Sequence, residues 1–315
     1  MKKSQEKSTA VCVYGPVPSR RLGFSLGIDI IPAKTCSLDC IYCQLGSTTK
    51  KTLQRKEYIS WKKVLSQIKD VLTSGLRIDY ITFSGSGEPT LNSALGKLIT
   101  EIKKITSIPV AVLTNSSLLS RKSVREALMK ADVVIPSLDA ATQEIFNHIN
   151  RPHPSLKAKK VIAGLKKLRQ EFEGSIWLEV MLVKSINDSP SHIQKLKEVI
   201  EEIKPDKIQL NTVVRPPSEE FALPLSLKEL EKIRDALGAN CEIIAEFRKK
   251  KQTPLEENLE SAILSMIRRR PVTLSDISTS LGRNKNEILK YLNLLLREGK
   301  IKLVIHKNLK YYEPI

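Results

Sequence analysis

Three cysteines lie in one short run, Cys36-Ser-Leu-Asp-Cys40-Ile-Tyr-Cys43. This spacing places three soft thiolates in a single loop, close enough together to bind one compact metal centre. Iron–sulfur cubes usually take four cysteines, and Gln44-Leu45-Gly46 supplies no fourth, so one iron would stay open to another ligand. A zinc site is the alternative, but it would need a fourth cysteine or histidine nearby. Cysteines without a metal are less expected, because free cysteines rarely cluster.

The cysteine run resembles that of the radical SAM superfamily, and Tyr42, just before the last cysteine, also matches the family form. The resemblance implies a [4Fe–4S] cluster on Cys36, Cys40 and Cys43, with S-adenosylmethionine (SAM) on the open iron and Tyr42 near its adenine. It also implies an external one-electron donor of the flavodoxin or ferredoxin type. Reductive cleavage of SAM would then give methionine and a 5′-deoxyadenosyl radical that abstracts a substrate hydrogen.

A glycine-rich turn follows the next predicted strand, as Gly85-Ser86-Gly87-Glu88-Pro89. Glycines let the backbone approach a ligand closely, and Glu88 adds an acceptor for a cation. The turn resembles the superfamily motif that receives the amino group of SAM, with Gly-Ser-Gly where the motif has a glycine pair. A simple turn is the alternative.

Polar residues also follow two later strands. Ser137 and Asp139 end the fourth predicted strand, and by analogy they would bind the ribose hydroxyls of SAM, as acidic residues do in dinucleotide folds. The alternative for Asp139 is a helix cap. Asn115 after the third strand is expected to reach the cofactor, and Glu179 and Asn187 are further candidates.

Longer stretches resemble radical SAM oxidoreductases related to the tRNA wyosine-base synthases, over roughly residues 11–247. They are Gly15–Gly23, Cys43–Gly46, Arg151–Pro154, Asn187–Ser189 and Arg215–Pro217. Wyosine synthases carry additional cluster cysteines, of which only Cys12 has a counterpart here. Arg20, Arg21, Arg151 and Arg215 form a candidate substrate set, because guanidinium groups bind phosphate or carboxylate in pairs of hydrogen bonds. Ion pairs with structural acids are the alternative.

The composition constrains partners and location. The 315 residues include 52 lysines and arginines against 34 acids, a net charge of +18. This excess favours polyanions such as RNA, although lysine enrichment in heat-adapted proteins would look the same. No apolar stretch is long enough to span a membrane and no signal peptide is evident, so we expect a cytoplasmic protein whose cysteines are reduced. We expect Cys12 and Cys241 to be buried free thiols.

The elements that must position these residues alternate between short apolar runs and longer amphipathic ones. Predicted strands are Leu26–Ile31, Tyr80–Ser84, Val110–Thr114, Val133–Ser137, Trp177–Val183, Lys207–Asn211 and Glu242–Phe247. Predicted helices are Ser60–Ser74, Ser93–Ile105, Arg121–Lys130, Leu156–Glu173, Ser191–Ile203 and Leu227–Leu237, with caps at Ser60, Ser120 and Ser226. The pattern predicts an α/β fold with parallel strands. The resemblance selects a partial TIM-like (β/α)6 barrel over an open doubly wound sheet, which places the candidate residues at the strands' carboxyl ends.

The last part of the chain has a different character. Lys249–Pro254 reads as a linker, so we expect one domain over residues 1–250 and a second over residues 251–315. Predicted helices Leu255–Arg269, Leu274–Leu281 (capped by Thr273) and Asn284–Arg297, then a hairpin of Ile301–Ile305 and Lys310–Glu313, resemble a winged helix. Its positive side chains are Arg268, Arg269, Arg270, Arg283, Lys285 and Lys290.

Three hypotheses follow for the function. The first is an RNA-modifying enzyme, in which the winged helix contacts phosphates. The second is an enzyme acting on a small molecule or peptide, with the winged helix as a protein-contact module. The third, an iron–sulfur transcription regulator, is the least favoured, because a regulator needs neither the Glu88 loop nor a ribose-binding carboxylate.

Overall fold

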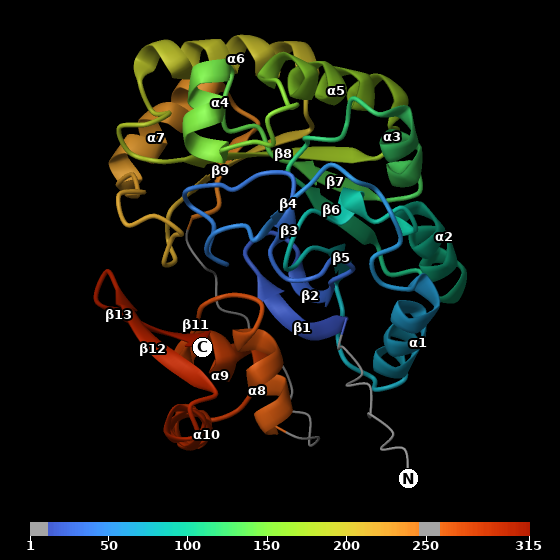
Figure 1. Cartoon of the computed structure of the whole chain (residues 1–315), viewed down its shortest axis with the longest axis vertical. Coiled ribbons are helices and arrows are strands. Elements are labelled where there is room, and N and C mark those ends of the chain that lie inside the picture. The colour runs from blue at the N-terminus through green and yellow to red at the C-terminus, as the bar shows by residue number, and fades with distance from the viewer. Residues whose placement is uncertain (1–11, 246–258) are drawn as a thin grey trace.

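The computed structural model describes residues 12–245 and 259–315 (Figure 1). An eight-stranded sheet in the order β1-β2-β5-β6-β7-β8-β9-β10 forms its centre. Every neighbouring pair from β2 to β10 is parallel, whereas β1 runs antiparallel to β2. The strands are β1 Val13–Ser19, β2 Gly23–Ile28, β5 Tyr80–Phe83, β6 Val110–Thr114, β7 Val133–Pro136, β8 Ser175–Leu182, β9 Lys207–Thr212 and β10 Cys241–Ile243.

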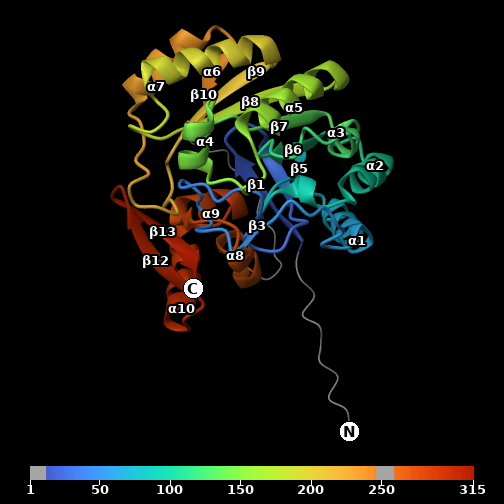
Figure 2. The same cartoon turned by 45° about the horizontal axis from the view of Figure 1, so that its top comes forward.

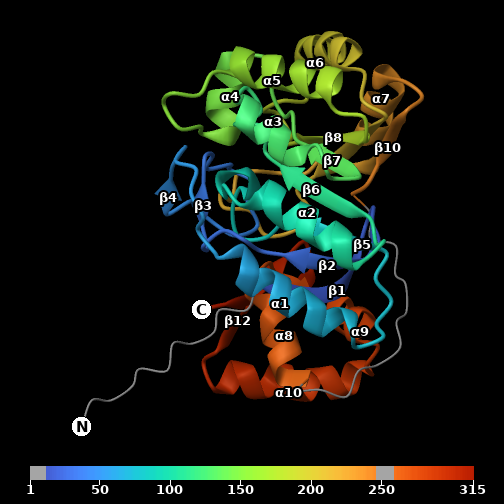
Figure 3. The same cartoon turned by 90° about the vertical axis from the view of Figure 1, so that its right-hand side faces the viewer.

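The helices form one continuous outer layer around this sheet (Figures 1 and 3). They are α1 Trp61–Leu72, α2 Leu95–Ile105, α3 Lys122–Leu128, α4 Gln143–Asn150, α5 Ala158–Glu171, α6 Pro190–Ile203 and α7 Leu227–Leu237. Neighbouring helices pack in chain order, α1 on α2, α2 on α3, α5 on α6 and α6 on α7. A layer on one side of a curved parallel sheet is the partial-barrel arrangement, so the α/β prediction is confirmed.

Most predicted boundaries agree with the structure, and the differences have local causes. Strand β6 and helix α7 match their predicted ranges, and Ser226 caps α7 in a capping box. The caps predicted at Ser60 and Ser120 are wrong: Ser60 stands at the N-cap of α1 but makes no side-chain hydrogen bond, and α3 begins after Arg121. The end of the predicted strand Glu242–Phe247 lies outside the described residues.

Strand β1 and helix α4 were not predicted. Gly15, Pro16 and Pro18 make β1 look like a loop, but an edge strand tolerates proline because one row of its backbone groups needs no partner. The core between sheet and helices is built from fully buried residues such as Leu26, Phe83 and Ile99. Each such side chain contributes roughly 1.5–3 kcal/mol when buried. The strand framework that carries the site is therefore well anchored.

Residues 259–315, which we call the C-terminal module, have their own hydrophobic cluster. It contains α8 Leu259–Ile267, β11 Val272–Thr273, α9 Leu274–Leu281, α10 Lys285–Arg297, β12 Ile301–His306 and β13 Leu309–Pro314. The three strands form an antiparallel sheet in the order β11-β13-β12. Thr273 caps α9 as predicted, whereas the predicted linker and domain boundary lie outside the described residues.

The C-terminal module packs on the edge of the barrel at β1 (Figures 2 and 3). Helices α8 and α9 both contact β1. The Arg269 guanidinium stacks 4.1 Å from the centre of the Tyr14 ring. The Tyr311 hydroxyl donates to the Val214 carbonyl at 2.8 Å, and Lys307 Nζ donates to the Val213 carbonyl at 2.9 Å, both in the segment after β9. The module thus contacts both the first strand and the segment beyond β9.

Candidate active site

The three cysteines of the predicted cluster loop line one cavity. Cys36 ends the short strand β3 (Thr35–Cys36), which pairs with β4 (Lys50–Lys51), and Cys40 and Cys43 follow in a loop beyond it. Backbone bonds from Asp39 to the Asn150 carbonyl and from Ile41 to the Ile149 carbonyl hold this loop against α4. All three thiols face a cavity of about 300 Å³.

The chemistry of this cavity fits a cluster better than a single ion. Burial raises the pKa of the Cys36 thiol to about 12 and raises the pKa values of Cys40 and Cys43, so the bare thiols hold their protons at neutral pH. A bound cationic metal centre reverses this by stabilising thiolates. Within residues 12–245 and 259–315, no three cysteine, histidine or carboxylate side chains are arranged to hold one metal ion. Three cysteines that line one cavity suit an iron–sulfur cube with one iron open to another ligand.

The glycine-rich turn lies directly against the cysteine loop. An added Cβ on Gly87 would come within 2.0 Å of the Thr35 carbonyl oxygen, and Gly85 has a φ of +147° with the Asp29 carboxyl 2.5 Å from an added Cβ. Neither position accommodates a side chain, which explains both glycines. The Ser86 hydroxyl and amide donate to Asp29 at 2.6 and 3.1 Å. Because Gly87 packs against Thr35, the residue before Cys36, the turn places Glu88 close to the cysteine loop.

Glu88 is buried and nearly saturated with hydrogen bonds. Its Oε1 accepts from the Thr90 amide at 3.0 Å, the Thr90 hydroxyl at 2.5 Å and the Thr114 hydroxyl at 2.7 Å. Among the residues that the structure describes, its Oε2 accepts only from the Asn115 amide, at 2.7 Å. Burial raises the pKa of Glu88, against the lowering effect of these bonds. Because a carboxylate oxygen can accept two bonds, Oε2 keeps a lone pair for a ligand cation in the cavity that Glu88 lines.

Asn115 connects the two predicted cofactor loops. Its backbone amide donates to Glu88, and its Nδ2 donates to Cys36 Sγ at 3.4 Å and to the Ser37 hydroxyl at 2.9 Å. Ser137, Tyr42 and Asn115 line the same cavity as Cys36 and Glu88, of about 370 Å³. The structure thus brings these predicted residues together at the carboxyl ends of neighbouring strands.

Asp139 lies beneath the cysteine loop and lines neither of these two cavities. Its Oδ2 accepts from the Tyr42 hydroxyl at 2.5 Å and from Asn150 Nδ2 at 2.8 Å, and its Oδ1 accepts from the Met181 amide at 3.0 Å. Burial raises its pKa to about 6. Asn150, which sequence reasoning missed, also donates to Cys40 Sγ at 3.4 Å. The predicted ribose role would therefore require this buried carboxyl to become accessible from one of the two cavities.

Asn187 is likewise engaged with the backbone rather than with a cavity. Its side chain bonds the Asp139 and Met181 carbonyls and the Val183 amide. It thereby fixes the turn after β8 next to Asp139.

We predict that Asp139→Ala destabilises the cysteine loop more than it weakens SAM binding. The change leaves three buried donors without their acceptor, at a cost of about 3 kcal/mol. The melting temperature should fall by several degrees, and a chelator should remove iron faster, with SAM affinity of the folded fraction within about threefold of wild type. Glu173→Ala, an exposed acid, is the control. A variant with wild-type iron retention and greatly weakened SAM binding would restore the ribose role instead.

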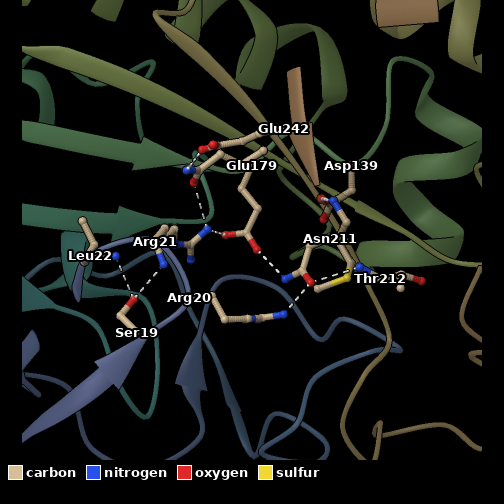
Figure 4. Close-up of polar contacts among 11 residues, drawn as sticks. Ser19, Arg20, Arg21, Leu22, Asp139, Glu179, Asn211, Thr212 and Glu242 are labelled. Atoms are coloured by element: carbon tan, nitrogen blue, oxygen red, sulfur yellow. Dashed lines mark hydrogen bonds and ion pairs between the residues drawn. The ribbon is translucent and has the colours of Figure 1, made fainter. Parts of the chain in front are cut away.

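The four predicted substrate arginines fall into two groups. Arg21 pairs with Glu179 at 2.7 Å, and Arg151 pairs with Glu219 away from the two cavities. Although burial works to raise it, the pKa of Glu179 is lowered by Arg21 and Asn211. Arg20 instead donates to the Asn211 amide oxygen at 2.8 Å, and Arg215 donates to Gln44 at 3.4 Å. Figure 4 shows Arg20 and Arg21 converging on Asn211 and Glu179.

The C-terminal module supplies part of the cavity wall, which the sequence did not indicate. Met266, Arg269 and Arg270 at the end of α8 line the cavity that contains Cys36 and Glu88. The sequence showed the positive charge of the Arg268–Arg270 run, but no sequence pattern predicted that this run would contact the barrel. Contacts between distant segments decide this placement.

Comparison with known proteins identifies the relatives of this chain. Residues 30–204 match the sequence profile of the Radical SAM superfamily. The chain is 36% identical to a UPF0026 protein of Methanocaldococcus jannaschii, over 91% of each chain. It is 41% identical to a protein named GTPase Obg in Brachyspira hyodysenteriae, over 95% of this chain but only 45% of that protein. The chain therefore spans less than half the length of this relative.

More distant matches agree in fold. A crystal structure of HydG, a maturase of the [FeFe]-hydrogenase, superposes with a TM-score of 0.51 at 14% identity, over 88% of this chain and 63% of that chain. The dual-specificity RNA methyltransferase RlmN of Buchnera aphidicola is 29% identical over 56% of this chain and 50% of its own length. The barrel thus has the fold that this superfamily shares.

Proposed function

We propose, because this chain belongs to the radical SAM superfamily, that it cleaves SAM by one-electron reduction and uses the resulting radical to modify RNA. Members of the superfamily are enzymes whose cofactors are a [4Fe–4S] cluster and SAM, so the predicted cofactors are confirmed. They also need an external electron donor, for which we propose a flavodoxin or ferredoxin. The placement of Cys36 and Glu88 on one cavity wall is the observation that carries the proposal.

The residues of this chain would hold the cofactors at two adjoining walls. Cys36, Cys40 and Cys43 would bind the cluster, and Asn115 would orient Cys36 through its hydrogen bond to the sulfur. Glu88 would accept from the SAM amino group, and Gly85 and Gly87 would let the turn pack against Asp29 and Thr35 so that Glu88 lines this cavity. When bound, the two cofactors supply a 5′-deoxyadenosyl radical. The walls of this cavity would limit the access of water to that chemistry.

RNA as the substrate rests on charge and on the C-terminal module. A net charge of +18 favours a polyanion, and RlmN, a distant relative, is by its name an RNA methyltransferase. The resemblance to wyosine-base synthases supports tRNA in particular. The order α8-β11-α9-α10-β12-β13 is that of a winged helix, and we propose that residues 251–315 form such a domain and contact phosphates.

A small molecule or peptide is the second candidate substrate. The hairpin of the C-terminal module exposes Leu303, Ile305 and Leu309, and Ile305 is 66% exposed. Exposed apolar side chains suit contact with a protein rather than with phosphates. In that case the module would be a protein-contact module.

In the described residues no helix is long and apolar enough to cross a membrane.

Salt dependence tests the RNA proposal. The affinity of full-length protein for bulk tRNA should fall steeply with salt, because each phosphate contact releases counterions. Replacing Arg283, Lys285 and Lys290 together by alanine should flatten the slope by about one unit per lost contact. Replacing Lys159, Lys160 and Lys195, on the outer helices α5 and α6, is the matched control. If wild-type protein binds no RNA above background at low salt, the second candidate is favoured.

A further inference from the structure

Three arginines from distant segments meet where the barrel contacts the C-terminal module. Arg20 follows β1, Arg215 follows β9 and Arg270 follows α8. All three line the cavity that contains Cys36 and Glu88. Arg20 and Arg215 also line the cysteine cavity and a third cavity, of about 650 Å³, along the contact between barrel and module. We call these three residues the arginine junction, because two of them border all three cavities.

The arginine junction lacks the carboxylate partners that its neighbours have. Among the described residues, none of the three forms an ion pair, unlike Arg21 with Glu179. Within residues 12–245 and 259–315, Arg20 and Arg215 donate only to amide oxygens, and Arg270 Nη2 is buried without a hydrogen-bond partner. Asp276 lies close enough to act on the junction, but its Oδ2 accepts from the Thr273 amide in the cap of α9. The positive charge is therefore only partly offset.

The three guanidinium groups also destabilise one another. Burial, then Arg21 and more weakly Arg270, lowers the pKa of Arg20 to about 10, although Glu179 and Asp276 act to raise it. Burial, then Arg270 and Arg20, lowers the pKa of Arg215 well below the usual value. Gathering desolvated like charges costs free energy unless an anion neutralises them. An anion bound among the three side chains would remove this cost.

We propose that the arginine junction binds a phosphate group of the substrate, and that Arg270 of the C-terminal module completes this site. The inference deepens the proposed function and rests on it for the identity of the reaction cavity. A phosphate offers acceptors in several directions, which matches three guanidinium groups from three segments better than a planar carboxylate does. The nucleotide so held would point its base or sugar toward Cys36 and Glu88. Its remainder would leave through the third cavity.

Anion binding by the cluster-free, full-length protein tests the junction without any turnover. Inorganic pyrophosphate, and uridine 5′-monophosphate beside uridine, would be titrated by calorimetry. We expect wild type to bind pyrophosphate and to prefer the nucleotide over the nucleoside. Arg270→Met should weaken pyrophosphate binding at least about tenfold, the effect of losing one charged hydrogen bond. The matched control is Arg268→Ala, an exposed neighbour that lines none of the three cavities.

The melting temperature separates an anion site from a structural role. Without ligand, Arg270→Met should melt at or above the wild-type temperature, because the change relieves repulsion among the three arginines. Lower melting together with unchanged pyrophosphate affinity would overturn the inference, as would a wild-type protein that binds no pyrophosphate. If Arg270→Met fails to fold, Arg215→Gln gives the same comparison.

Two further outcomes distinguish a failure of the anion site from a failure of the proposed function. If Arg270→Met reduces SAM affinity of the reconstituted protein as much as pyrophosphate affinity, the junction serves the SAM carboxylate and the inference is wrong. If reconstituted wild type releases no 5′-deoxyadenosine while pyrophosphate binding still requires Arg270, the proposed function fails but the anion site stands.

Discussion

Protein in which Cys36, Cys40 and Cys43 are all replaced by alanine is expected to hold no iron–sulfur cluster after anaerobic reconstitution. Wild type should hold about four irons and four sulfides per chain, as one cubane requires. The expected loss is complete, because these three are the cysteines that line the cavity, and hard oxygen ligands do not replace thiolates. Iron and sulfide analysis with absorption spectra would measure it.

Cys12→Ala and Cys241→Ala are the matched controls. The two thiols are buried in the core, as predicted, with Cys12 only 1% exposed and Cys241 7% exposed, and neither lines the cysteine cavity. Both variants should keep the full cluster, with at most a modest loss of stability from the missing sulfur. Retention of the cluster in the triple variant would disprove the ligand assignment, and its loss in Cys12→Ala alone would point to a different ligand set.

Local sequence patterns were sufficient to predict the loops and strands that carry this site. The cysteine spacing, the glycines before Glu88 and the apolar runs of β6 and β7 are all short-range features, and all were visible in the sequence. Since parallel strands end at the same edge of a sheet, their order alone brings Cys36, Glu88 and Asn115 together. In the structure these three residues line one cavity, and their roles toward a cluster and SAM stay predictions.

Pairing between distant residues could not be predicted in the same way. Asp139 looked like a ligand because it ends a strand, but it is buried, and Tyr42 and Asn150 from two other segments both bond its Oδ2. Arg21 and Arg151 looked equivalent to Arg20, yet each meets an acid far along the chain. These partners come from tertiary contacts, which carry no local signature. A motif thus indicates which residue types are present more reliably than it indicates which atoms remain available.

The prediction for Glu88 depends on which of its carboxylate oxygens can still accept a hydrogen bond. Replacing Glu88 by glutamine should weaken SAM binding about 10- to 100-fold, the range expected for a lost hydrogen bond to a charged group. The physical reason is the lone pair on Oε2, which carries a single bond from Asn115 and borders the cavity. An amide nitrogen at that position would present hydrogens to the SAM ammonium and repel it. Calorimetric titration of the reconstituted protein with SAM measures the change.

Thr90→Val is the matched control for the hydrogen-bond network around Glu88. It removes the hydroxyl that donates to Oε1 at 2.5 Å but keeps the carboxylate charge and its open oxygen. We expect Thr90→Val to lower the melting temperature by a few degrees and to bind SAM within about threefold of wild type. Glu88→Gln should also keep its cluster, because the Glu88 carboxylate is hydrogen-bonded to Thr90, Thr114 and Asn115 and not to a cluster cysteine. If Glu88→Gln binds SAM as well as Thr90→Val does, the carboxylate only braces the turn, and the SAM amino group must be bound by another acceptor in the same cavity.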